Sequence, residues 1–141
     1  MIDDLGQRIA RVLPVLLVAL LVCACDRGGG DFPGVKLELE VSPEPPQLGP
    51  ATITVILEDA SGLPLAGADI EVEANMSHAG MVPVIGAGLE TAPGIYQTRL
   101  EFTMGGDWFI VVRARLEDGR SAEWVVDLPG VDAVCGDTPQ P

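Results

Sequence analysis

Strict alternation of apolar and polar residues is the feature that most constrains the fold of this chain. In the first such stretch, 36–41, the apolar residues are Leu37, Leu39 and Val41, and the same period recurs in 51–58 and 69–75. A two-residue period gives a strand one buried and one solvated face. No stretch beyond the first two dozen residues has a helical period. The sequence therefore predicts an all-β fold.

Segments rich in Gly, Pro and Asp separate the alternating stretches and mark turns. Gly105–Gly106 and Asp118–Gly119 predict hairpins, because glycine readily accepts the positive φ of tight turns. The predicted strands are 36–41, 51–58, 69–75, 81–85, 95–103, 107–116 and 120–127. About seven short strands predict an immunoglobulin-like antiparallel β-sandwich over 35–128.

Strand direction predicts which loops lie together. Successive strands of an antiparallel sandwich usually alternate in direction, so loops after the first, third and fifth strands share one end. The loop 42–50, the segment after Asn75 and the turn 104–107 are expected at that end. This expectation requires 81–85 to be a strand; without it, the last two move to opposite ends.

The N-terminus resembles a bacterial lipoprotein signal, with Arg8 and Arg11 before the apolar run 12–22. The run is shorter than the roughly 20 residues of a membrane-spanning helix. Small or apolar residues precede Cys25, so residues 1–24 are expected to be removed and Cys25 to be lipidated. Residues 25–34 then form a flexible tether. The predicted location is extracytoplasmic, in the periplasm or on the outer face of the cytoplasmic membrane.

The chain has three cysteines, and this reading leaves none for a disulfide. Cys23 leaves with the signal and Cys25 carries lipid. Cys135 lies in 129–141, a segment expected to be a disordered C-terminal tail. The domain must therefore depend on its hydrophobic core.

Charge and motif content exclude two classes of function. Eight Lys and Arg against 21 Asp and Glu give a net charge of −13, which repels a phosphate backbone, so no nucleic-acid partner is expected. The chain has a single histidine, and it contains no nucleophile-elbow, phosphate-loop or CxxC motif. We expect a non-catalytic protein.

The segment 76–81 holds the sole histidine and two of the four methionines. Met76, His78 and Met81 would be joined by Met104 through the shared end of the sandwich. Thioethers with an imidazole form a soft donor set that suits Cu(I) better than Zn²⁺, Ca²⁺ or Mg²⁺. Trp108 would present its ring face beside such a cation.

A structural role for the same residues remains open. Met76 and His78 continue the inward phase of the strand 69–75, and Met104 continues that of Leu100 and Phe102. Methionine commonly fills irregular gaps in a core. The alternative function is therefore a non-metal immunoglobulin-like interaction or accessory module of the cell envelope.

Three segments, 73–84, 94–96 and 102–108, resemble the YtkA-like and FixH-like family. They match its Met/His loop, its Gly-x-Tyr strand start and its Met-Gly-Gly-Asp-Trp turn. The resemblance implies a membrane-tethered immunoglobulin-like domain in copper trafficking or oxidase maturation. It assigns the loop to Met76, His78 and Met81, and the turn to Met104 and Trp108. The implied partners are the membrane, through the lipid anchor, and a copper enzyme or oxidase assembly factor.

Overall fold

The computed structural model describes residues 32–78 and 80–132. Within these ranges the chain forms seven strands and no helix. The strands are β1 (Val35–Ser42), β2 (Gly49–Asp59), β3 (Asp69–Met76), β4 (Val84–Ala92), β5 (Ile95–Phe102), β6 (Gly106–Arg115) and β7 (Ser121–Val131). The predicted all-β class is confirmed.

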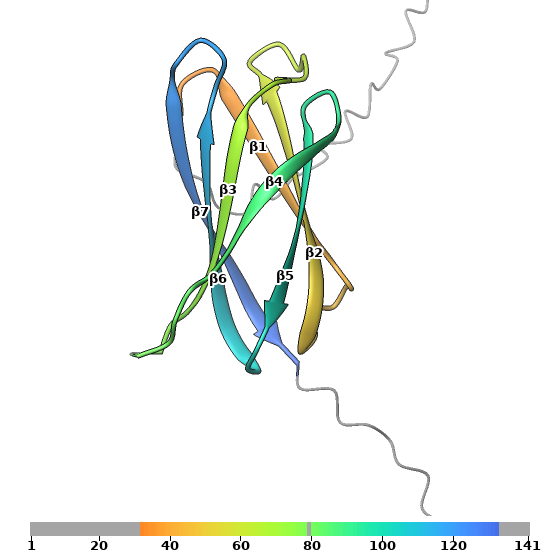
Figure 1. Cartoon of the computed structure of the whole chain (residues 1–141), viewed down its shortest axis with the longest axis vertical. Coiled ribbons are helices and arrows are strands. Elements are labelled where there is room, and N and C mark those ends of the chain that lie inside the picture. Colours follow the sequence, from red (N-terminus) through yellow and green to blue (C-terminus); the bar gives the residue numbers. More distant parts are fainter. Residues whose placement is uncertain (1–31, 79, 133–141) are drawn as a thin grey trace, which may run out of the picture.

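All named strand pairs are antiparallel, in the order β1-β2-β5-β4-β3-β6-β7. The sheet folds back so that β1, β2 and β5 face β3, β6 and β7 across the core (Figure 1). A parallel bridge between Gln47 and Asp132 joins the two outer margins at one end. The architecture is the expected immunoglobulin-like sandwich, nearly closed into a barrel.

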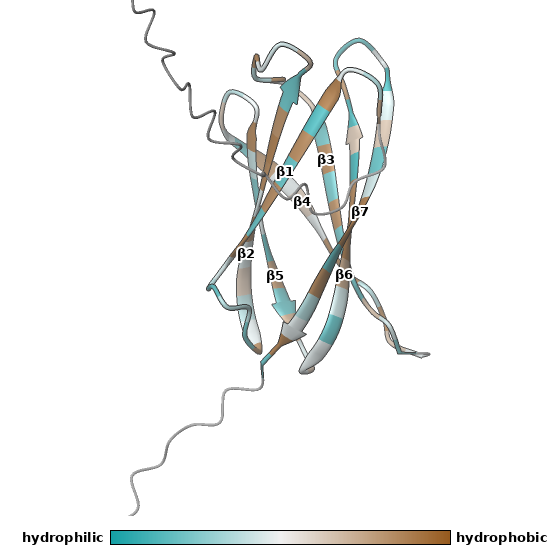
Figure 2. Ribbon diagram, turned by 180° about the vertical axis from the view of Figure 1, so that it is seen from behind, coloured by the Kyte–Doolittle hydropathy of each residue, from teal (hydrophilic) through white to brown (hydrophobic). Residues whose placement is uncertain are grey.

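Alternation places the core as the sequence predicts. Inward side chains of β2 and β6 are almost completely buried, including Ile53, Leu57 and Ile110 at 0% exposure. Figure 2 shows apolar and polar bands alternating along β1 and β7. Burial of one face per strand supplies the hydrophobic stabilisation that a domain of this size needs.

The strand β4 passes from one layer of the sandwich to the other. Its first half, Val84–Gly88, pairs with β3, and its second half pairs with β5. It runs diagonally between the two layers in Figure 1. The predicted strand 81–85 is therefore present but shifted to Val84–Ala92, because the inward positions are Gly86 and Gly88 and carry no apolar side chain to mark the phase.

Two further boundaries differ from the predictions. Gly105–Gly106 does not form a hairpin, since β5 and β6 belong to different layers and do not pair. Turn-forming residues indicate that the chain changes direction, but they do not indicate which strands pair with each other. The hairpin at Asp118–Gly119 is confirmed, with Gly119 N donating to Leu116 O at 2.9 Å. The strand β7 continues to Val131, beyond the predicted domain end at 128.

The loops after β1, β3 and β5 lie at one end of the sandwich, as predicted (Figure 1). The register aligns Met76 at the end of β3 with Trp108 near the start of β6. Leu48 N, in the loop after β1, donates to Asp132 O at 2.9 Å, just beyond β7. We call this the Met/His end, since it carries Met76, His78, Met81 and Met104.

Candidate functional site

The end of β3 and the turn between β5 and β6 are held together by backbone contacts. Ser77 N donates to Asp107 O at 3.4 Å, and Met76 pairs with Trp108 in the register. Pairing across β3 and β6 therefore brings the start of the Met/His loop, Met76 and Ser77, beside the turn that carries Met104. The two segments are nearly 30 residues apart in the sequence and meet only through the sandwich topology.

Gly106 makes room for Met76. Its φ of 128° lies in the region that favours glycine. A Cβ at this position would lie 3.3 Å from Met76 Cε, so the methyl group of Met76 packs over the glycine backbone. A larger residue at 106 would require this methyl group to shift and would strain the backbone at this φ.

Trp108 fixes the turn 104–107 from the core of the sandwich. Its indole Nε1 donates to Met104 O at 2.9 Å, and the ring is 2% exposed. The indole also meets Phe102 edge to face, with ring centroids 5.1 Å apart. Trp108 is thus a core residue that fixes the backbone of Met104.

Asp107 ties the turn to the end of β7. Its Oδ1 accepts a hydrogen bond from Gly130 N at 3.0 Å, while its carbonyl accepts from Ser77 N. One residue therefore connects three segments of the Met/His end. No motif in the sequence predicted this role of Asp107. The one indication was its position in the turn 104–108, between Gly105–Gly106 and Trp108.

The four candidate donors differ in exposure. Met76 is 7% exposed, and Met81 is half-buried against the hydrophobic core. His78 is exposed, and Met104 is 46% exposed. Two thioethers therefore line the inside of this end, and one thioether and the imidazole lie at its surface.

The chemistry of this donor set fits a soft monovalent cation. Cu(I) accepts thioether and imidazole ligands, whereas Ca²⁺ and Mg²⁺ require several oxygens. Within 32–78 and 80–132, no group of three or more His, Cys, Asp or Glu side chains could hold a metal ion. The thioethers and the imidazole make the Met/His end the candidate metal centre.

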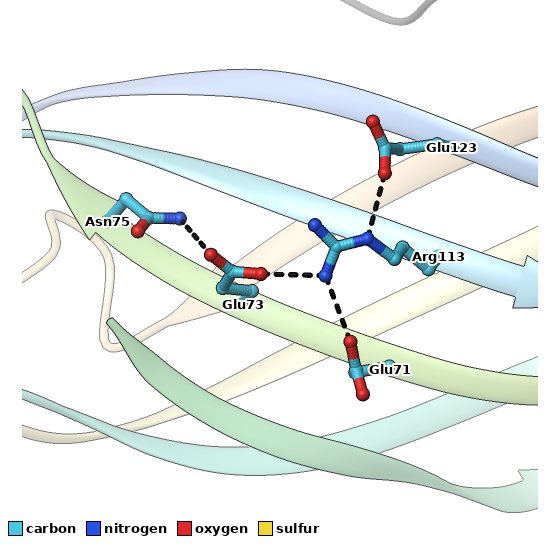
Figure 3. A network of polar contacts seen from close by, with 5 residues as sticks. All are labelled: Glu71, Glu73, Asn75, Arg113 and Glu123. Atoms are coloured by element: carbon cyan, nitrogen blue, oxygen red, sulfur yellow. Dashed lines mark hydrogen bonds and ion pairs between the residues drawn. The ribbon is translucent and has the colours of Figure 1, made fainter. Parts of the chain in front are cut away.

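A second polar cluster lies on the outer face of the sandwich, away from this end. The guanidinium of Arg113 on β6 contacts Glu71 at 2.9 Å, Glu73 at 2.6 Å and Glu123 at 2.8 Å (Figure 3). Hydrogen bonds from Arg113, and then from Asn75, lower the pKa of Glu73. The same carboxylates, led by Glu73, raise the pKa of Arg113. These ion pairs connect outward side chains of the neighbouring strands β3, β6 and β7.

The lipidation site predicted at Cys25 lies outside the described residues, as do Cys23 and Cys135. Among residues 32–78 and 80–132, there is no helix with the length and apolar character to cross a bilayer. The anchor therefore remains a prediction from the sequence. Of the predicted tether 25–34, only residues 32–34 are described, and here the prediction needs correction, because Phe32 packs edge to face against Trp124 with ring centroids 6.4 Å apart.

Solved structures similar to this chain include the following two. The soluble domain of PmoD from Methylocystis sp. ATCC 49242 (Rockwell) has a TM-score of 0.48 at 12% identity, with 73% of this chain and 100% of that chain covered. A DUF4426-family protein from Pseudomonas aeruginosa PAO1 has a TM-score of 0.55 at 11% identity, with 73% and 94% covered. At such identities the likeness to the second protein concerns the fold alone.

A match at the level of sequence comes from a family model. No curated protein matches the sequence. The model described as YtkA-like matches residues 34–113, more than half of the chain. The matched region includes β1 to β5, most of β6 and all four candidate donors. The chain belongs to the YtkA-like family.

Proposed function

We propose that this chain is a non-catalytic, membrane-anchored extracytoplasmic domain that binds Cu(I) for copper trafficking or oxidase maturation. The observation that carries the proposal is the meeting of the Met/His loop and the Met104 turn at one end of the sandwich. Membership of the YtkA-like family supports it, because the sequence resemblance implies a copper-linked role.

In this function Met76, His78, Met81 and Met104 would hold the metal. Asp107, Gly106 and Trp108 keep the turn beside the loop, which lowers the entropy lost on binding. The metal is cargo that the domain gives to a copper enzyme or oxidase assembly factor, so the protein makes and breaks no substrate bond. Exposed His78 and Met104 would be the first donors that a receiving protein meets.

A non-metal interaction module is the second candidate. Burial of Met76 and the packing of Met81 against the core favour it, since both contacts stabilise the fold without a metal. The two candidates differ in whether the thioethers and the imidazole bind Cu(I) with defined stoichiometry.

The test is a Cu(I) titration against a chromophoric Cu(I) competitor. We expect one equivalent to bind, and His78→Ala, Met81→Leu and Met104→Leu each to weaken binding by more than about tenfold, the lower end of the loss expected even for outer-shell partners. Leucine keeps the apolar volume of methionine and removes only the sulfur. Tyr96→Phe, at the opposite end, is the control. Binding that survives all three ligand substitutions would favour the non-metal module.

The anchor has its own test. Cys25→Ala removes the thiol that the lipoprotein signal requires, so the variant should leave the membrane fraction or keep its signal uncleaved. Cys135→Ala is the matched control and should fractionate like the parent. Membrane association of Cys25→Ala after normal removal of residues 1–24, seen by intact mass, would remove the lipid anchor from the proposal.

A further inference from the structure

Two large apolar residues of β4 point outward, whereas Val84 at the start of the strand packs against the core. Ile85 is 59% exposed and Leu89 is 71% exposed. A Cβ on Gly86 would collide with Thr98 Oγ1 and lie 2.9 Å from Leu100 Cδ2, so the crossing of the layers requires glycine inside. Close packing thus explains the inward glycines, but it does not require large aliphatic side chains outside.

Register places Ile85 beside other outward apolar groups, whereas Leu89, farther along the same outer side of β4, pairs with Gln97 of β5. Ile85 pairs with Glu73, Glu73 with Val111, and Val111 with Val125, which form one row across β4, β3, β6 and β7. Val125 is 47% exposed, and Val111 is buried. We call this surface, carried by Ile85, Leu89, Val111 and Val125, the β4 face.

The β4 face is hollowed and has an acidic margin. A groove of about 640 Å³ runs over β3, β4, β6 and β7 beside Ile85, and its charged lining residues are Asp69, Glu71, Arg113, Arg115 and Glu123. Arg115 lies directly across from Asp69 in the register. The positive charge of Arg113 is already engaged by three carboxylates. Asp127 on β7 adds a further exposed carboxylate to the same face.

The negative charge around the β4 face determines which kind of partner can bind there. A second copy would bring the same acidic margin, and each chain carries a net charge of −13. An anionic lipid surface would be repelled in the same way. Complementarity instead requires a cationic partner with apolar side chains.

We propose that the β4 face docks a cationic segment with an apolar stripe from a partner protein. Aliphatic side chains of that segment would cover Ile85 and Leu89, and its Lys or Arg side chains would meet the acidic margin. Docking at this surface needs no metal, so this proposal can be tested independently of the proposed Cu(I) site. Because β4 starts three residues after Met81, a docked partner would lie next to the Met/His loop.

The test uses the full chain without metal in non-ionic detergent, and a short synthetic peptide of alternating Lys and Leu that carries a benzophenone. Binding is measured by anisotropy, and photo-crosslinks are mapped by mass spectrometry. We expect crosslinks on β4 and β7. Ile85→Thr with Leu89→Thr should weaken binding by at least about tenfold, since two aliphatic contacts are lost. Threonine preserves strand propensity.

Two controls keep the result decisive. Leu63→Thr changes an aliphatic side chain that is 62% exposed outside the β4 face, and it should leave binding unchanged. Asp69→Asn with Asp127→Asn should reduce the salt dependence of binding. Equal binding of the parent and the Ile85/Leu89 double variant, scattered crosslinks, or equal binding of a Glu-Leu peptide would each overturn the proposal.

Discussion

The two ends of the sandwich use their polar groups differently. At the end away from the methionines, the Tyr96 hydroxyl donates to Leu65 O at 2.8 Å and accepts from Ala68 N at 2.9 Å. Glu90 accepts from Gly67 N and Gly94 N. We call this the Tyr96 end. Its side-chain oxygens are used to hold loop backbones.

At the Met/His end, the ties come from Asp107 and Trp108, and they hold backbone groups. Met76 and Met81 pack against the core. Trp108 bonds the carbonyl of Met104 and not its sulfur. His78 and Met104 remain exposed. The difference teaches that polar side chains at one end hold loop backbones, whereas the other end fixes its turn and keeps two of the candidate donors, His78 and Met104, exposed.

The largest effect on stability is expected from Gly94→Ala at the Tyr96 end. Gly94 has a φ of 74°, and a Cβ there would lie 2.8 Å from Leu57 O. Backbone strain and the close contact should together cost about 3 kcal/mol in the free energy of unfolding, measured with urea. Cu(I) affinity should not change.

Gly62→Ala is the matched control for that substitution. Gly62 also has a positive φ, 84°, but nothing lies within 4 Å of the added methyl group. It should therefore show only the cost of backbone strain, about 1 kcal/mol. Equal losses in the two variants would mean that close packing does not distinguish Gly94.

Tyr96→Phe should come next. The hydroxyl is removed from a residue that is 1% exposed, which leaves Leu65 O and Ala68 N without their partner. The expected loss is about 2 kcal/mol in the free energy of unfolding. A simultaneous loss of Cu(I) affinity would contradict the separation of the two ends.

Asp107→Ala tests the Met/His end. Unlike Tyr96→Phe, it should change Cu(I) affinity more than the free energy of unfolding. Loss of the hydrogen bond from Gly130 N should cost only about 1 kcal/mol in stability. Cu(I) affinity should fall more clearly, because the turn that carries Met104 is no longer tied to β7. Asp107→Asn keeps an acceptor oxygen and should retain most of the affinity. Equal affinities for both variants and the parent would show that the tie does not position the turn.

Much of this arrangement could be predicted from alternation. Inward residues such as Ile53 and Ile110 revealed their strands, and the parity of the strands placed 76–81 and 104–107 at one end. These predictions rest on two premises. The two-residue period is read directly from the sequence, and antiparallel pairing is the usual arrangement of successive strands in a sandwich.

Other features could not be read locally. The inward glycines of β4 hid its phase, and Gly105–Gly106 did not reveal that β5 and β6 belong to different layers. The role of Asp107 depends on Gly130, which becomes its neighbour only when β7 pairs with β6. Long-range pairing therefore decides what local turn chemistry leaves open.

The smallest predicted effect is a dependence on acid that belongs mainly to the Tyr96 end. Hydrogen bonds from the Ser61 hydroxyl and Leu63 N lower the pKa of Asp59, and bonds from the Arg120 backbone and side chain lower that of Asp118. Asp59 is the last residue of β2 and Asp118 lies in the loop after β6, so both carboxylates are opposite the Met/His end.

The sign of the effect follows from these directions. As the pH falls, the unfolded chain takes up protons first, near the ordinary aspartate value of 3.8. The stabilisation is therefore present above that value and is lost as the pH falls through the lower pKa of each folded carboxylate. Asp59→Asn with Asp118→Asn should flatten the acid limb of a plot of unfolding free energy against pH. An acid limb that remains as steep as the parent's would place the responsible groups elsewhere, with Glu73 on the β4 face tested next by Glu73→Gln.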